Sequence, residues 1–315
     1  MSSEAVGDAR PTVSVVIPCF RSANTLNPLL ERLMPVLDDV ASRSEVILVV
    51  DGSPDNTWHV ARDASAAYER VEAIRLSRNF GQHNALLAGI RAATFDLVVT
   101  MDDDLQHRPE DVARLLAGLT DDVDLVYGVP EHPPNGWVRG VASWLGRAFL
   151  THGLGVGHAG DISAFRLFRT RLREGFASLD GPHISIDVAL SWTTTCVRAI
   201  RVSLDRRHDG RSGYTTRTLL SQLFHLVFGY STLPLRVVSY LGLLCGALGF
   251  GMLVFVLTAY AVGYTAVPGF TSIASMVALF AGAQMVAIGV VGEYVARVHV
   301  RTTGQPSYVI TRDEP

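Results

Sequence analysis

The chain has 315 residues, of which 48% are hydrophobic and 18% are charged, and its formal net charge is −3. This length allows one sizeable α/β domain with a further module, and the charge balance excludes a nucleic-acid partner. Three cysteines without paired spacing exclude a disulfide framework and a zinc site, and they favour a reducing compartment.

Most of the chain before residue 130 alternates between apolar runs and segments with helical spacing. Residues 1–10 are short and polar, so we expect a flexible tail there and not a signal peptide. Strands are expected at 12–18, 45–50, 71–76, 96–101 and 124–128, and helices at 24–40, 55–68, 81–93 and from 109 onward. The alternation predicts an α/β domain over residues 11–214, with a mostly parallel sheet covered by helices.

Two later segments have the spacing of amphipathic helices. Trp137–Leu154 and Thr215–Leu235 each place apolar residues on one side, with arginines among or beside them. Both could lie in the membrane interface, or both could be ordinary core helices. The second runs directly into an uncharged stretch, so residues 215–236 are expected to form a juxtamembrane helix.

Two uncharged stretches follow, Val237–Val262 and Phe270–Gly292. As helices they would be roughly 39 Å and 34 Å long, enough to cross a hydrocarbon core of about 30 Å. We therefore expect a hairpin of two transmembrane helices within residues 237–296 and a tail over residues 297–315. Arginines flank the hairpin at both outer ends, which predicts a multi-pass protein with its catalytic domain and both termini in the cytoplasm.

The strongest motif is the run Asp102-Asp103-Asp104, which follows the strand expected at 96–101. Three adjacent carboxylates repel one another, and a hard divalent cation such as Mg²⁺ or Mn²⁺ would relieve that repulsion. Such a metal would bridge a diphosphate and stabilise the charge that develops as a sugar–phosphate bond breaks. The alternative is a solvated acidic helix N-terminus. Asp51 follows another strand end, so both features are expected at the ligand-binding edge of the sheet.

Several segments, in order and separation, resemble family 2 glycosyltransferases of the GT-A fold, a Rossmann-like architecture. These are Val16–Phe20, Val50–Asp55, Ser77–Gln82, Asp102–Gln106, Asp161–Leu167 and Arg207–Tyr214, followed by the two-helix C-terminus. More narrowly, the chain is similar to the polyprenyl-phosphate glycosyltransferases, which include dolichol-phosphate mannose synthase and bacterial enzymes that act on undecaprenyl phosphate. The resemblance implies sugar transfer from a nucleotide-diphosphate sugar to a polyprenyl phosphate, at the inner membrane of a bacterial cell.

The resemblance also implies roles for residues on the donor side. The metal and the diphosphate would be held by Asp102, Asp104 and Gln106, with Asp104 counted among the catalytic residues. The nucleotide sugar would also contact Pro18, Phe20, Asp51 and Asp103, although position 103 varies among relatives. The chain departs from the family pattern at Val50, Arg21-Ser22, Ala164 and Gly213, so the resemblance does not name the nucleotide or the sugar.

On the acceptor side, the resemblance places Arg139 and Ser143 at the lipid phosphate and makes Arg139, Asp161, Arg166 and Arg207 catalytic residues. A phosphate monoester is largely a dianion at neutral pH, because its second pKa is about 6. It needs steering by arginines more than a general base, so we expect direct displacement with inversion. Asp161 would orient the acceptor or act as a base. Some relatives assemble as tetramers, so a homo-oligomer is a further expectation.

One alternative is a membrane glycosyltransferase that acts on a saccharide hydroxyl. Asp187 could then be the base, or it could simply cap or line a helix. A non-catalytic membrane scaffold is the third hypothesis, and the intact Asp102, Asp104 and Gln106 argue against it. The histidines show no metal spacing, and we expect most of them in loops or on the surface.

Overall fold

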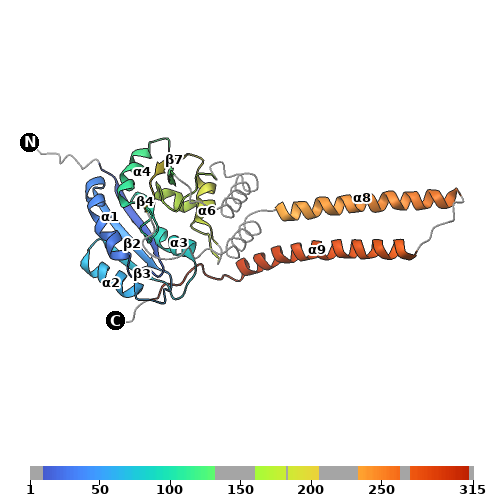
Figure 1. Ribbon diagram of the computed structural model, residues 1–315, viewed down its shortest axis with the longest axis horizontal. Coiled ribbons are helices and arrows are strands. Elements are labelled where there is room, and N and C mark those ends of the chain that lie inside the picture. Colours follow the sequence, from blue (N-terminus) through green and yellow to red (C-terminus); the bar gives the residue numbers. More distant parts are fainter. Residues whose placement is uncertain (1–9, 132–159, 182–183, 206–232, 263–269, 312–315) are drawn as a thin grey trace, which may run out of the picture. The chain divides into compact units, whose positions relative to one another are not determined.

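The computed structural model describes residues 10–131, 160–181, 184–205, 233–262 and 270–311. These residues belong to two compact units, one formed by 1–216 together with 304–315 and the other by 217–303. The helix expected at 137–154, the expected tail apart from Arg10, and most of the juxtamembrane segment 215–236 lie outside the described residues. Figure 1 labels the helices and strands that are named below.

The first unit is built on a sheet that has seven strands in the described part of the chain, in the order β3-β2-β1-β4-β6-β5-β7. The strands are β1 (Thr12–Cys19), β2 (Arg43–Val50), β3 (Val71–Arg75), β4 (Leu97–Thr100), β5 (Leu125–Pro130), β6 (Arg166–Arg169) and β7 (Val197–Val202). β6 is antiparallel to both of its neighbours, β4 and β5, whereas the other pairs are parallel. The expectation of a mostly parallel sheet is therefore confirmed.

Helices cover both faces of this sheet (Figure 1). They are α1 (Leu26–Val40), α2 (Thr57–Ala67), α3 (Gln82–Ala92), α4 (Val112–Gly118) and α6 (Ile186–Thr193), with short 3₁₀ turns η1 (Pro109–Asp111) and η3 (Thr170–Phe176). The apolar side chains of α1, α2 and α4 form one core, and those of α3, η3 and α6 form another. Successive side chains of a strand point to opposite faces, so Val15 of β1 lies in the first core and Val16 in the second.

The registers of the parallel strands bring their carboxyl ends to one edge. Cys19 at the end of β1 pairs with Val50 at the end of β2, and β4 ends at Thr100 on the other side of β1. Asp51 follows β2 directly, and Asp102 comes two residues after β4. The two features expected at the ligand-binding edge therefore do leave the sheet on the same side.

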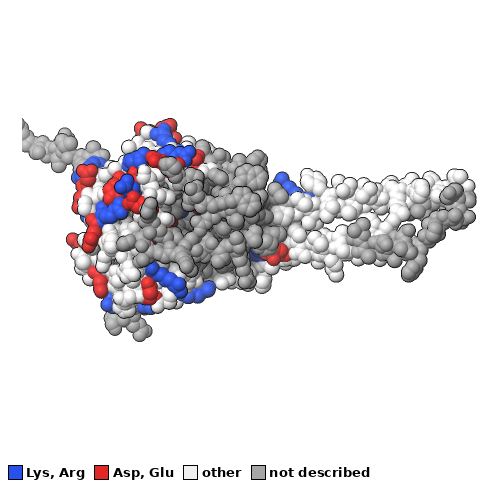
Figure 2. Space-filling view, viewed as in Figure 1, with Lys and Arg blue, Asp and Glu red and all other residues white. Residues whose placement is uncertain are grey.

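The second unit contains two helices, α8 (Leu233–Ala261) and α9 (Phe270–Thr302), which lie side by side (Figure 1). Large apolar side chains along α8 are exposed, including Leu243 at 73% and Phe255 at 69%. Figure 2 shows both helices almost free of charged side chains. Among the described residues, one helical stretch, Pro234–Ala259, is long and apolar enough to cross a membrane. Both segments of the expected hairpin are thus helical, and α9 continues past the expected boundary at 296.

After α9 the chain returns to the first unit. Residues 309–311 pair with the edge of the sheet beyond β3, where Ser77 N donates to Val309 O at 2.9 Å and Thr311 N donates to Arg75 O at 2.8 Å. Ser307 is 1% exposed, and its hydroxyl donates to Asp180 Oδ1 at 3.0 Å. The C-terminal tail expected from the sequence is therefore, in this part, a packed segment of the sheet-containing unit.

We predict that Ser307→Ala lowers the free energy of unfolding by about 1–3 kcal/mol. The Ser307 hydroxyl also accepts the Gly181 N–H at 3.0 Å, and alanine would leave that buried donor unpaired. The thermal midpoint of the purified protein in detergent measures the effect. Thr303→Ala, at an exposed position near the end of α9, is the control. Equal midpoints for the two variants would contradict this account of the tail.

Candidate active site

The loop after β1 is fastened to the loop after β2 by hydrogen bonds. Arg21 N donates to Ser53 Oγ at 2.8 Å, and Ser22 N donates to Thr57 Oγ1 at 2.8 Å. Arg21 has φ +59, a left-handed conformation that is uncommon for a residue with a side chain. These contacts hold Phe20, which is 42% exposed, at the rim of the strand-end edge.

Asp51 holds the loop that follows β3. Its two carboxylate oxygens accept the backbone N–H groups of Phe80, at 2.7 Å, and Gly81, at 2.9 Å. Burial raises the pKa of the Asp51 carboxyl above its ordinary value, although these two hydrogen bonds oppose the shift. The Asp51 carboxylate therefore fixes the backbone at the start of α3. It also lies at the edge of the sheet where the nucleotide sugar is expected to bind.

The three carboxylates after β4 point to different partners. Asp102 Oδ1 accepts from Gln82 Nε2 at 2.7 Å, and Asp104 Oδ1 accepts from Gln106 N at 3.1 Å. Asp103 is turned toward the loop after β1, where its Oδ2 accepts from Phe20 N at 3.0 Å and from the Ser22 hydroxyl. The acidic run is therefore attached both to the loop after β1, through Asp103, and to the first turn of α3, through Asp102.

Electrostatic repulsion is retained within this acidic run. Burial raises the pKa of Asp103 to about 6, and the negative charges of Asp102 and Asp104 add to that rise. Leu105 has φ +60 and is 7% exposed, so the backbone between Asp104 and Gln106 is held in an unfavourable conformation by the core around it. Strain and like charge at one strand end are features typical of a functional site.

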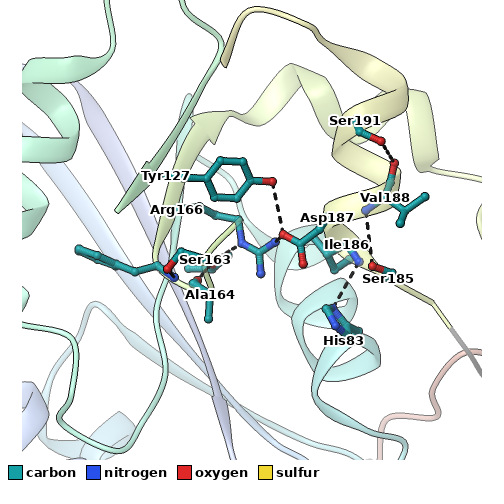
Figure 3. Close-up of polar contacts among 12 residues, drawn as sticks. His83, Tyr127, Ser163, Ala164, Arg166, Ser185, Ile186, Asp187, Val188 and Ser191 are labelled. Atoms are coloured by element: carbon teal, nitrogen blue, oxygen red, sulfur yellow. Dashed lines mark hydrogen bonds and ion pairs between the residues drawn. The ribbon is translucent and has the colours of Figure 1, made fainter. Parts of the chain in front are cut away.

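A second polar cluster lies deeper, around Arg166 of β6 (Figure 3). Arg166 is 1% exposed and pairs with Asp187 in the first turn of α6. Its Nε also donates to Thr100 Oγ1 at 2.9 Å, and the Tyr127 hydroxyl donates to Asp187 Oδ1 at 3.3 Å. Burial raises the pKa of Tyr127, so this hydroxyl keeps its proton and remains a donor.

Comparisons with known proteins decide the family. The model of glycosyl transferase family 2 matches residues 14–176. The undecaprenyl-phosphate 4-deoxy-4-formamido-L-arabinose transferase of Proteus mirabilis (strain HI4320) is 31% identical over 303 residues, which cover 95% of this chain and 93% of the relative. The protein of that name from Enterobacter sp. (strain 638) is 33% identical over 307 residues, with the same coverage. The chain belongs to glycosyl transferase family 2.

Solved structures agree with this glycosyltransferase in fold. Glucosyl-3-phosphoglycerate synthase from Mycobacterium tuberculosis, crystallised with Mn²⁺, uridine-diphosphate and phosphoglyceric acid, is similar with a TM-score of 0.52 at 19% identity. That match covers 69% of this chain and 76% of the other. Mannosyl-3-phosphoglycerate synthase from Rubrobacter xylanophilus matches with a TM-score of 0.51 at 16% identity, covering 69% and 72%. The expected GT-A type of α/β fold is thereby confirmed.

The structure brings the donor-side residues predicted from the sequence to one edge of the sheet. They are Pro18, Phe20, Asp51, Asp102, Asp103, Asp104 and Gln106. Asp161 lies in the loop before β6, and the other predicted acceptor-side residues, Arg139, Ser143 and Arg207, lie outside the described residues. Arg166, expected among the reacting groups, has its guanidinium inside the core, bonded to Thr100 and Asp187.

Sequence reasoning missed two features of this glycosyltransferase. The pairing of Asp187 with Arg166 joins residues 21 positions apart, and no local pattern announces it. His107, one of the histidines expected mostly in loops or on the surface, lies in the loop after β4 but is only 8% exposed and stacks on Phe165 with 5.3 Å between ring centroids. The sequence offered one signal for the burial of His107, which is its position directly after Gln106, where the chain turns back toward the core.

We predict that Gly52→Ala disrupts the strand-end loops. Gly52 has φ +55, and a Cβ there would lie 2.2 Å from the carbonyl carbon of Arg78 and 2.3 Å from the backbone nitrogen of Asn79. The left-handed conformation alone costs a residue with a Cβ about 1–2 kcal/mol, and the clash adds to it. Thermal unfolding measures the loss. Gly160→Ala is the matched control, because no heavy atom lies within 4 Å of its Cβ position. An unchanged midpoint for Gly52→Ala would refute the close packing of these loops.

Proposed function

We propose that this glycosyltransferase transfers a sugar from a nucleotide-diphosphate sugar to a polyprenyl phosphate at the cytoplasmic face of the membrane. The observation that carries the proposal is similarity to undecaprenyl-phosphate sugar transferases over 95% of the chain, a share too large to be confined to the sheet-containing unit. Similarity confined to the sheet-containing unit would support only the fold and the general reaction class.

The acidic run suits a divalent cation held jointly by protein and donor. Among the described residues, no group of three or more His, Cys, Asp or Glu side chains could hold a metal without other ligands. Asp103 binds the loop after β1, and the proposed metal ligands are the carboxylates of Asp102 and Asp104 and the amide of Gln106. Mg²⁺ is commonly bound by one or two carboxylates together with substrate phosphates, and Mn²⁺ accepts the same ligands, so this donor set fits. Bound there, the metal would neutralise the departing diphosphate.

The other proposed roles of the side chains are to position the two substrates and to balance their charge. Pro18, Phe20 and Asp51 line the edge at which the nucleoside would bind, with Asp103 supporting the loop that carries Phe20. Arg139, Ser143 and Arg207 would hold the acceptor phosphate and the donor by charge-assisted hydrogen bonds. The acceptor is already a dianion, so the lipid phosphate displaces the nucleotide directly and inverts the anomeric carbon. Asp161 orients that acceptor in the proposed mechanism.

The two apolar helices carry the part of the proposal that concerns the membrane. We propose that α8 and α9 both cross the inner membrane, so that the sheet-containing unit and both termini lie in the cytoplasm. The apolar length of α8 and the arginines Arg236, Arg297 and Arg301 near the outer ends of the two helices support this orientation. Assembly into a homo-oligomer, with the tetramer as the expected form, belongs to the same proposal.

The alternative with a saccharide hydroxyl as acceptor needs a general base, and Asp187 was its candidate. Asp187 Oδ1 accepts from both Arg166 and Tyr127, and its side chain is only 14% exposed. These two contacts hold the carboxylate against neighbouring side chains of the core, which favours a structural role for Asp187 over that of a base for an acceptor hydroxyl. The lipid-phosphate acceptor, which needs no such base, is therefore favoured.

A donor panel tests the proposed function. Purified protein in detergent is given undecaprenyl phosphate, Mg²⁺ or Mn²⁺, and radiolabelled nucleotide sugars that include glucose, mannose and 4-deoxy-4-formamido-L-arabinose donors. We expect label to enter the organic phase with at least one donor and to be absent when the lipid phosphate is replaced by undecaprenol. Label transferred only to a saccharide, with no donor giving a lipid product, would refute the proposal.

We predict that Asp102→Asn and Asp104→Asn each reduce transfer at least about 10²-fold, because each removes charge that holds the metal on the diphosphate. Chelation should abolish transfer by the wild-type enzyme, and added Mg²⁺ or Mn²⁺ should restore it. Asp121→Asn, which removes a carboxylate at an exposed loop position, controls for the loss of charge. Wild-type rates in both Asp102→Asn and Asp104→Asn would rule out the metal mechanism.

A further inference from the structure

Arg166 is a full positive charge in a nearly inaccessible place. It heads the largest fully buried side chains of the described residues, at 1% exposure. A buried guanidinium is costly unless it is paired and its N–H groups are bonded, and removing one partner of such a pair is far more damaging than replacing both. The contacts of Arg166 therefore indicate which role a buried positive charge has at this position.

Arg166 binds Thr100, which lies between the acidic run and the loop that contains Asp161. Its Nε donates to Thr100 Oγ1 at 2.9 Å, and that hydroxyl in turn donates to Ala164 O at 2.7 Å. Thr100 is the last residue of β4, two positions before Asp102. Ala164 is three positions after Asp161. The Thr100 hydroxyl thus connects the strand that precedes the acidic run with the loop that contains Asp161, and Arg166 fixes the orientation of that hydroxyl.

Asp187 fixes the guanidinium from the side of α6 (Figure 3). The first turn of α6 is itself held, because Ser185 caps it and Ile186 N donates to His83 Nδ1 at 3.3 Å. Burial and the charge of Arg166 lower the pKa of His83, against the opposite effect of Asp187, so the ring stays neutral and can accept this bond. His83 follows Gln82, whose amide binds Asp102. α6 is therefore connected to the acidic run by a second route, through α3.

We propose that Arg166 and Asp187 form a positioning pair that sets the Asp102 strand end and the Asp161 loop in register for transfer. Neither residue touches the reacting atoms in this role. The proposal rests on the proposed function only for what is transferred. In this proposal Asp187 positions other groups and does not act as a general base.

Three kinds of variant test the pair. Asp187→Asn keeps the shape and removes the charge, and Arg166→Lys keeps the charge and removes the planar fork. The double variant Arg166→Met with Asp187→Leu replaces both partners by apolar side chains of similar size. Arg171→Lys is the matched control, because Arg171 forms an exposed pair with Asp124 at 2.8 Å. Each protein is assayed for kcat, for KM of donor and acceptor, for the pH profile of kcat, and for its thermal midpoint.

We expect kcat to fall about 10²-fold in both single variants, as a displacement near 1 Å of reacting groups produces. KM for the donor and the shape of the pH profile should stay close to wild type, because no titrating catalytic group is lost. The double variant should regain thermal stability relative to the single variants and remain slow. The Arg171→Lys control should match wild type in every measurement.

Two results would overturn the proposal. A folded double variant with wild-type kcat would make the pair purely structural. Loss of an ionisation from the pH profile in Asp187→Asn, with wild-type kcat in Arg166→Lys, would make Asp187 the base. Hydrolysis of the donor, in which water takes the sugar and nucleoside diphosphate is released, is measured in parallel, since it needs no lipid acceptor. Release by the wild-type enzyme without a labelled lipid would count against the proposed function, and the same ratios between variants would still decide the pair.

Discussion

Repulsion among three consecutive carboxylates at the end of β4 constrains everything around it. The chain separates them by sending Asp103 to the loop after β1 and Asp102 to the first turn of α3. Each separation also ties a neighbouring segment to the strand end. The remaining charge is what a metal–diphosphate complex would neutralise. The site is therefore organised around a negative charge that, in the proposed mechanism, the metal and the substrate would balance together.

The parallel part of the fold could be predicted from the sequence because it depends on local patterns. Continuous apolar runs such as Val46–Val50 are typical of strands buried on both faces, and the order of strands and helices then determines which ends meet. Asp51 and Asp102 were assigned to one edge by that argument, and the structure places them there. The apolar composition of α8 was equally clear from the sequence.

The remainder depends on contacts between distant residues. β6 has four residues and lies antiparallel between β4 and β5, and so short a run has no reliable signature. The resemblance placed Arg166 among the reacting groups, and its burial could not be predicted because its partner Asp187 belongs to another element. The direction of Asp103 was also hidden, since adjacent aspartates look alike until the loop after β1 supplies its N–H and hydroxyl donors.

The docking of residues 304–311 has a practical consequence for anyone who trims the protein to obtain a soluble fragment. β3 is an edge strand, and the chain just past it relies on this segment to pair the N–H of Ser77 and the carbonyl of Arg75. A fragment that ends before α8 would expose those groups, and an open sheet edge invites pairing between molecules and aggregation. Joining the two parts of the sheet-containing unit by a flexible linker, with 304–311 kept, would leave that edge closed.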